Sequence, residues 1–183
     1  MIKTRLKFYN VSEIVGGMDI GLLVLTDEAM TRQLSITCDK NMVKAFCLRM
    51  NHAPGVERLL PEALGRLLRQ EGHHFEIHIH SIVDGIYKTL LIDTDTLETV
   101  DIRVSDAVLF AQTNDFPIYI EEELMSNQST PFDAEQPNRL SLPINALSNK
   151  MLKMALEKSI NIEDYKMAEY LNEELKRRKN KTE

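Results

Sequence analysis

The sequence of 183 residues predicts an α+β fold, in which a mixed, mostly antiparallel sheet has flanking helices and a helical hairpin follows at the C-terminus. Three observations lead to this prediction. Short segments of alternating or continuous apolar residues follow one another with tight turns between them. Segments with the apolar periodicity of an α-helix follow the third and the sixth of these short segments. A proline-containing stretch then precedes two further helical segments.

The N-terminal part of the chain predicts three strands and two helices. The strands are expected at residues 4–9, 19–26 and 32–37. Asp39 can accept a hydrogen bond from the first turn of a helix that runs to about Asn51. Pro54 disfavours continuation of this helix, whereas Pro61 suits the first turn of a second helix, which ends near Gly72.

The middle of the chain predicts a three-stranded meander, a helix and a short strand. The meander strands are expected at residues 75–83, 87–92 and 97–103. Asp84 and Gly85 predict a two-residue hairpin, because a type I′ turn needs positive φ at both positions. Ser105 is expected to cap a helix that runs to about Asn114, and the short strand follows at 117–120.

The chain divides into a main domain, a linker and a C-terminal hairpin, at residues 1–125, 126–145 and 146–183. The linker composition is rich in proline, serine, asparagine and glutamine. Residues 147–158 and 162–179 are expected to be helices, with Asn161 as the cap of the second. A hairpin of this size buries too little surface to be stable alone, so it should dock on a partner protein, on the main domain or on another copy.

The charge is unevenly distributed along the chain. Residues 1–145 hold 13 Lys and Arg against 21 Asp and Glu, a balance of −8, and residues 146–183 have a balance of +2. An acidic main domain does not attract phosphate backbones from a distance, so contact with nucleic acid would need a local basic patch or bound cations.

Other compositional features point to a cytoplasmic protein. No apolar run is long enough for a transmembrane helix, and the first residues lack the apolar block of a signal peptide, so we expect no membrane association. Cys38 and Cys47 are too few for a disulfide framework or a zinc motif, and we expect buried free thiols.

Charged residues gather around the turn between the last meander strand and the helix after it. Asp101, Arg103 and Asp106 could bind a divalent cation, Mg²⁺ or Mn²⁺, and orient a phosphate. The structural alternative is that Arg103 pairs with one of the two aspartates while Asp106 only stabilises the first turn of the helix.

Three other polar groups leave alternatives open. Four polar residues that alternate along one predicted strand share a face, which either binds a transition metal or is solvated: His74, Glu76, His78 and His80. Residues 121–123, all glutamate, are either a metal site or a solvated helix start. The basic residues at 176–181 either touch nucleic acid or complement the dipole of the last helix.

Three pieces of the sequence resemble the bifunctional nuclease domain family, over roughly residues 12–125. They are V-D-G-I-Y at 83–87, D-I-R-V-S-D-A at 101–107 and F-P-I-Y-I at 116–120, the last followed by Glu122 and Glu123. The resemblance implies an α+β fold with a curved sheet, cleavage of both DNA and RNA, and assembly into homo-oligomers.

Two pieces depart from the pattern of that family. Its members usually carry L-P-I-x-I-G with a glutamate a few residues later, whereas this chain has L-S-I-T-C-D at 34–39 and Met42. They also usually carry a Thr-His pair before the second helix, where this chain has Leu60 and Pro61. An acid and an imidazole of the family site are therefore replaced.

The C-terminal hairpin resembles the UVR motif, a helical hairpin that mediates docking between proteins. The matching segment is 147–178, with I-E-D-Y-K-M-A at 162–168 as the turn and the start of the second helix. The resemblance implies a protein partner for this hairpin.

The sequence therefore supports two hypotheses. The first is a nuclease that hydrolyses phosphodiester bonds of DNA and RNA with little sequence preference, whose site contains Asp101, Arg103 and Asp106, with Asp84 and Glu122 as neighbours. The second is a non-catalytic interaction or regulatory module that keeps the fold and docks a partner through the UVR-like hairpin. The acidic domain, Met42 and Pro61 favour the second.

Overall fold

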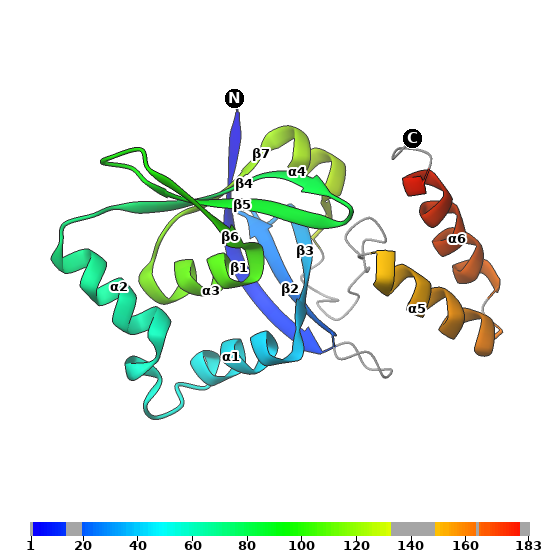
Figure 1. Ribbon diagram of the computed structural model, residues 1–183, viewed down its shortest axis with the longest axis horizontal. Helices are drawn as coiled ribbons and strands as arrows, with labels where there is room; N and C mark the ends of the chain where they lie inside the picture. Colours follow the sequence, from blue (N-terminus) through cyan, green and yellow to red (C-terminus); the bar gives the residue numbers. More distant parts are fainter. Residues whose placement is uncertain (1, 14–19, 133–148, 164, 180–183) are drawn as a thin grey trace.

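A computed structural model describes residues 2–13, 20–132, 149–163 and 165–179 (Figure 1). Within these residues the strands form one sheet in the order β6-β5-β4-β7-β1-β2-β3-β8. Neighbouring strands pair antiparallel except β4 and β7, which are parallel, so the predicted mixed, mostly antiparallel sheet is confirmed. The strands are β1 Lys3–Glu13, β2 Ile20–Asp27, β3 Arg32–Asp39, β4 Phe75–Val83, β5 Ile86–Asp93, β6 Thr99–Arg103, β7 Ile118–Glu121 and β8 Thr130–Pro131.

Helices flank this sheet, as the sequence predicts. They are α1 Lys40–Met50, the 3₁₀ helix η1 Val56–Arg58, α2 Leu60–Gln70, α3 Val104–Asn114, α4 Glu122–Gln128, α5 Asn149–Asn161 and α6 Tyr165–Lys179. Figure 1 shows α1, α2 and α3 together on one side of the sheet. The α1 helix packs on β1, β2 and β3, whereas α3 packs on β3, β4, β5 and β6. The main domain is therefore an α+β fold.

The main core lies between the sheet and the helices α1 and α3. Its fully buried side chains are apolar and come from both halves of the sheet and from α1, among them Leu23, Leu34, Phe46, Ile77 and Ile120. The α3 helix is apolar around most of its circumference and buries all but a few of its residues, which explains why it lies at the centre of the domain.

Two local predictions in the main domain are confirmed. Asp84 and Gly85 have φ of 51° and 75° and form the turn between β4 and β5, where the left-handed conformation favours Asp-Gly. The Asp39 side chain caps α1 by accepting a hydrogen bond of 2.9 Å from the Met42 amide.

Two predicted helix caps are wrong. β6 continues to Arg103 and α3 begins immediately afterwards, so Arg103 occupies the capping position and Ser105 is buried in the first turn. Asn161 is the last residue of α5 and does not cap α6, because the first helix extends through it.

The predicted linker overlaps with the folded domain. Ser126 to Gln128 continue α4, and Thr130 and Pro131 pair with β3. The remainder of that segment, at 133–148, lies outside the described residues. The sheet therefore extends at least to Pro131, beyond the expected domain boundary at residue 125.

The C-terminal helices α5 and α6 pack on each other and have a small core of their own. Leu152 and Leu171 are buried at its centre, and Met151, Ala155, Leu156 and Leu175 pack against them. Several large apolar side chains of the hairpin are exposed, including Ile160, Ile162 and Tyr165. Two antiparallel helices are present as predicted, and part of their apolar surface faces solvent.

Candidate functional site

Three charged side chains meet where two distant strands of the sheet end. The Arg103 guanidinium at the end of β6 holds the Asp106 carboxylate with two hydrogen bonds, from Nε at 2.5 Å and from Nη2 at 3.2 Å. Its Nη1 donates to Asp39 Oδ2, at the end of β3, at 2.9 Å. Arg103 therefore links two carboxylates that belong to opposite halves of the sheet. Asp39, Arg103 and Asp106 are called the Arg103 cluster below.

The local sequence places each of these side chains at the start of a helix. Asp39 caps α1, Arg103 occupies the capping position of α3, and Asp106 lies in the first turn of α3. A positive charge at a helix N-terminus is unfavourable, whereas a carboxylate there is stabilised by the helix dipole. The two aspartates therefore offset the cost of placing Arg103 between two helix N-termini.

The site is charged and open to solvent at neutral pH. The amide of Met42 and the Arg103 guanidinium hold the pKa of Asp39 below its usual range, against the opposing effect of burial. The Asp106 carboxylate in turn raises the pKa of Arg103. The side chains of Asp39, Arg103 and Asp106 are exposed by 45%, 59% and 42%, so a substrate in solution can reach all three.

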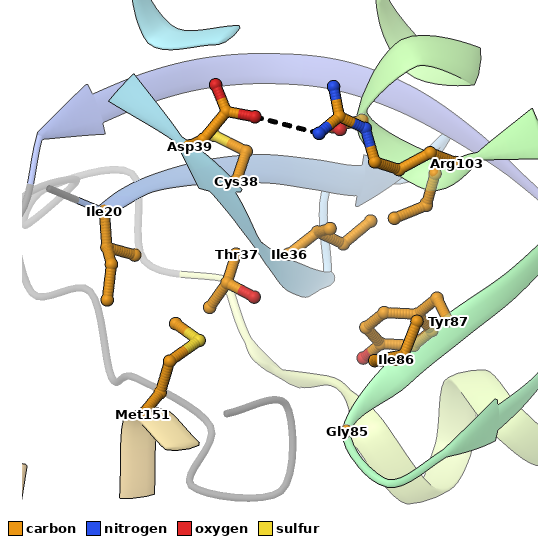
Figure 2. A pocket seen from close by; sticks show the side chains of 12 residues that line it. Ile20, Ile36, Thr37, Cys38, Asp39, Gly85, Ile86, Tyr87, Arg103 and Met151 are labelled. Carbon is orange, nitrogen blue, oxygen red and sulfur yellow. Dashed lines mark hydrogen bonds and ion pairs between the residues drawn. The ribbon is translucent and has the colours of Figure 1, made fainter. Parts of the chain in front are cut away.

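A pocket of about 370 Å³ opens beside this ion-pair cluster. Figure 2 shows its walls, with Arg103 and Asp39 at one side and β5 at the other. Most of the lining is apolar and comes from four parts of the chain, namely Ile20 and Ile36, Ile86 and Tyr87, Val104, and Met151 of α5. The C-terminal hairpin thus contributes one side chain to the wall of a pocket in the main domain.

Asp101 and Asp84 lie at the edge of this cluster. Asp101 shares a face of β6 with Arg103, since the two are two residues apart in a strand. It is exposed and has no ion-pair partner among the residues that the structure describes. Asp84 is exposed in the turn next to Gly85, which lines the pocket.

Glu122, by contrast, belongs to a second arginine cluster. Both of its carboxylate oxygens accept from Arg32, at 2.7 and 3.3 Å, and Thr4 and Ser126 also donate to it. Arg32 also donates to Asp27 at 3.2 Å. Arg32 begins β3 and Asp39 ends it, a separation of about 23 Å along an extended strand. The structure therefore does not bring Glu122 to the Arg103 cluster.

The sequence predicted Asp39 only as the cap of α1, and Tyr87 only as part of a strand and of the V-D-G-I-Y piece, without a role in the site. The signal for Asp39 was present, because it is an acidic residue at a strand-to-helix junction, and Asp101 and Asp106 flank another such junction. The half-buried thiol of Cys38 beside it has a pKa raised to about 12, mainly by burial, so it is neutral at physiological pH. Cys38 and Cys47 are both free, as expected, and only partly buried.

The alternating polar residues of β4 do not form one metal site. Glu76 pairs with Lys3 at 3.1 Å, and His78 Nε2 lies 2.8 Å from Glu121. Burial lowers the pKa of His78, which favours its neutral form despite the neighbouring Glu121 carboxylate. His80 is exposed at the bulge of the strand. Glu76 and His78 therefore have separate partners and do not converge on one ion.

A different group near the start of β4 could hold a metal ion. The ligand atoms of His73, Asp93 and Asp95 lie within 4.8 Å of one another. His73 Nδ1 is 2.6 Å from Asp93, which also accepts two backbone hydrogen bonds in its turn. Lys88 of β5 is the register partner of Arg103. Asp93 lies five residues further along β5, a distance of about 17 Å. This group is therefore remote from the Arg103 cluster.

Comparison with known families decides the assignment of the main domain. A sequence model of the bifunctional nuclease domain matches residues 23–133, more than half of the chain. The chain belongs to the bifunctional nuclease domain family. No curated protein matches it. No helix in the described residues is long and apolar enough to cross a membrane.

The region matched by the nuclease domain contains every charged side chain of the Arg103 cluster. It runs from β2 through β8, so it also includes Asp84, Asp101 and Glu122. Met151 lies beyond it, and the match carries no information about the C-terminal hairpin. The family supports a nuclease-like function in general.

Proposed function

We propose that this protein hydrolyses phosphodiester bonds of DNA and RNA at the Arg103 cluster, with little sequence preference. The observation that carries the proposal is the position of Arg103, held between Asp39 and Asp106 at the mouth of a pocket in a nuclease-family domain. Convergent charged side chains beside a cavity are what a polar reaction site needs.

Arg103 has the donors that a phosphate requires. A guanidinium carries five N–H groups, and three of them serve Asp39 and Asp106. The two that remain can donate to phosphate oxygens, and the positive charge stabilises the charge that develops on them during hydrolysis. Contacts to phosphate do not distinguish one base from another. A site that relies on them has little sequence preference and can act on both DNA and RNA.

The aspartates hold the guanidinium in place and supply oxygen atoms. Because each Asp106 oxygen and Asp39 Oδ2 already accepts from Arg103, these carboxylates fix the plane of the guanidinium before substrate arrives. Their outward lone pairs remain open to solvent, and the pKa of Asp39 is low enough to keep it ionised. An ionised carboxylate at this position can orient an attacking water by accepting its proton in a hydrogen bond.

The residues present fit Mg²⁺ or Mn²⁺ as an assisting ion. Mg²⁺ is usually held by one or two carboxylates together with substrate phosphates, and exposed Asp101 and partly exposed Asp106 offer such oxygens on either side of Arg103. A bound divalent cation would supply Lewis-acid polarisation of the phosphate. It would also offset the negative balance of the main domain, which otherwise disfavours nucleic acid.

A non-catalytic module is the second candidate, and two observations favour it. The trio of Asp39, Arg103 and Asp106 has a formal charge of −1, and Arg103 is already paired with both carboxylates. Met42, which stands where the family usually has an acid, is buried in the core. A closed ion-pair cluster of this kind could simply join the ends of β3 and β6.

The C-terminal hairpin is proposed to act as a docking element in either case. Its core is separate from that of the main domain, and Ile160, Ile162 and Tyr165 are exposed on it. An apolar surface of this kind suits a protein partner or a second copy of the chain, as expected of a UVR-like hairpin.

A cleavage assay on the purified full chain tests the proposed activity. Single-stranded and duplex DNA and RNA are incubated with Mg²⁺, with Mn²⁺ or with a chelator, beside an Asp106→Ala variant. We expect cation-dependent cleavage of both nucleic acids by the wild type and a loss of orders of magnitude in the variant, at a nearly unchanged melting temperature. No cleavage by the wild type under any condition would support the non-catalytic module.

A further inference from the structure

The pocket beside Arg103 is lined mostly by apolar side chains, is small and is open to solvent on one side. Its volume of about 370 Å³ lies near the lower end of ligand pockets, which span ~300–1,000 Å³. Side chains from β3, β5, the start of α3 and α5 face it (Figure 2). A space of this size and character accepts one flat, largely apolar group such as an aromatic ring, and it is too small for a stack of paired bases.

One buried polar group in the wall lacks a partner. The hydroxyl of Tyr87, a residue that is only 4% exposed, makes no hydrogen bond within the part of the chain that the structure describes. Figure 2 shows the Tyr87 ring on the pocket side of β5, with its oxygen toward the space between the strands. Buried hydroxyls are normally paired, so this one has an unused hydrogen-bonding capacity. It is covered from solvent, and a ligand in the pocket can pair with it once a covering side chain such as the exposed Ile86 moves aside.

The charge at the rim specifies the kind of ligand. Arg103 lines the same pocket and keeps two unused N–H groups, so a ligand with a flat ring and an adjacent phosphate would satisfy both features at once. A nucleotide unit of a nucleic acid has this composition. In a duplex the base is stacked and paired, so only an unpaired base can enter a side pocket.

We propose that this pocket receives one unpaired nucleobase of a single-stranded segment while the adjoining phosphate lies against Arg103. The inference rests on the proposed function and gives it a substrate class, namely single-stranded or locally melted nucleic acid. Tyr87 acts as a positioning residue that pairs with a polar edge of the base without selecting its identity. Met151 makes the C-terminal hairpin part of the base site.

Equilibrium binding to matched oligomers tests this inference separately from cleavage. Fluorescence anisotropy compares the full chain on three labelled ligands: a phosphorothioate oligothymidylate, an oligomer of the same length built from abasic units, and a duplex. We expect the oligothymidylate to bind at least about fivefold more tightly than the abasic oligomer, the lower range for one inserted base. The duplex should bind no better than the abasic oligomer.

Two variants and one control locate the effect. Tyr87→Phe keeps the ring and removes the hydroxyl, so the preference for bases should decrease while the melting temperature does not fall. Ile86→Trp should fill the pocket and abolish the preference without weakening binding of the abasic oligomer. Val83 is the register partner of Ile86 and similarly exposed, but does not line the pocket, so Val83→Trp should retain the preference.

The outcomes separate this inference from the proposed function. Equal affinity for the base-containing and abasic oligomers, together with normal cleavage, would overturn the base pocket and leave the nuclease intact. Loss of the preference in Val83→Trp to the same extent as in Ile86→Trp would also overturn it. Neither binding nor cleavage by the wild type would overturn both.

Discussion

Arg103 at the end of β6 lies 2.9 Å from Asp39 at the end of β3, although five strands separate β6 from β3 in the sheet. A flat sheet would keep these two ends far apart, since neighbouring strands lie about 4.8 Å from each other. The contact therefore depends on the curvature of the whole sheet, with α3 packed against both β3 and β6. The candidate site is a consequence of that curvature.

Asp39 should act in two separable ways, as a helix cap and as a charge. Asp39→Ala removes both, and we expect it to lower the free energy of unfolding by about 0.5–2 kcal/mol and to reduce cleavage. Asp39→Asn retains a good capping acceptor, so stability should change little while cleavage still falls. Urea unfolding and cleavage rates measure the two effects. Full activity in the Asn variant would show that Asp39 is only a cap.

The Arg32 cluster predicts how stability depends on pH. Hydrogen bonds from Arg32 and then Thr4 lower the pKa of Glu122 from its ordinary 4.5 to about 2. Burial alone raises the pKa of Asp27, but hydrogen bonds from Thr31 and Arg32 outweigh it and lower the value from 3.8 to about 2. Because the folded pKa values are depressed, this stabilisation is present above about pH 4.5 and is lost as the pH falls toward 2.

Glu122→Gln tests that dependence. The variant should be less stable than the wild type at neutral pH and should lose less stability between pH 4.5 and 2. Denaturant unfolding across this range gives the slope of the free energy of unfolding against pH. Glu123→Gln, at the exposed neighbouring position, is the matched control. A slope equal to that of the wild type in Glu122→Gln would contradict the assignment.

The cation dependence of cleavage should depend on the Arg103 cluster and not on His73. Asp101→Asn removes an exposed carboxylate beside Arg103, so a higher Mn²⁺ concentration should be needed for half-maximal rate. His73→Gln changes the metal-competent group at the far end of β5 and should leave that concentration unchanged. A titration of rate against Mn²⁺ distinguishes them, and the reverse pattern would place the catalytic ion at His73, Asp93 and Asp95.

Deleting residues 146–183 should leave the main domain folded, because its core contains no residue of the hairpin. We expect the truncated chain to melt cooperatively near the temperature of the full chain and to lose any self-association seen by light scattering. An unfolded truncated chain, or one that retains every association of the full chain, would show that the hairpin is not a separable docking element.

The parts of the fold that depend on near neighbours in sequence were predictable. The Asp84-Gly85 turn needs only two residues with positive φ, and the Asp39 cap needs only an acceptor before an apolar helix. The Arg103–Asp106 pair is also local, being three positions apart. The predicted cap at Ser105 failed because strand β6 leads into the helix without a connecting residue, which no local pattern specifies.

The remaining features of the site depend on contacts between distant parts of the chain. The Asp39–Arg103 pair spans 64 positions and the Arg32–Glu122 pair spans 90. The sequence predicted Glu122 as a neighbour of the Arg103 cluster because both lie where a strand ends. In the structure, Glu122 pairs with Arg32, at the opposite end of β3 from Asp39. The pocket was likewise not predictable, since its walls come together only when the sheet curves.

Two arginines in this domain each bridge two carboxylates, and comparing them tests the central proposal most directly. Arg103 lies at the pocket and Arg32 at the other end of β3, so Arg32→Gln is a matched control for Arg103→Gln. The measurement is kcat/KM for DNA and RNA cleavage by both variants, with folding checked by circular dichroism. Arg103→Gln should lower kcat/KM by about 10²–10³-fold, and Arg32→Gln by no more than severalfold. A folded Arg103→Gln variant that cleaves as fast as the wild type, or an equal loss in both variants, would contradict the proposal.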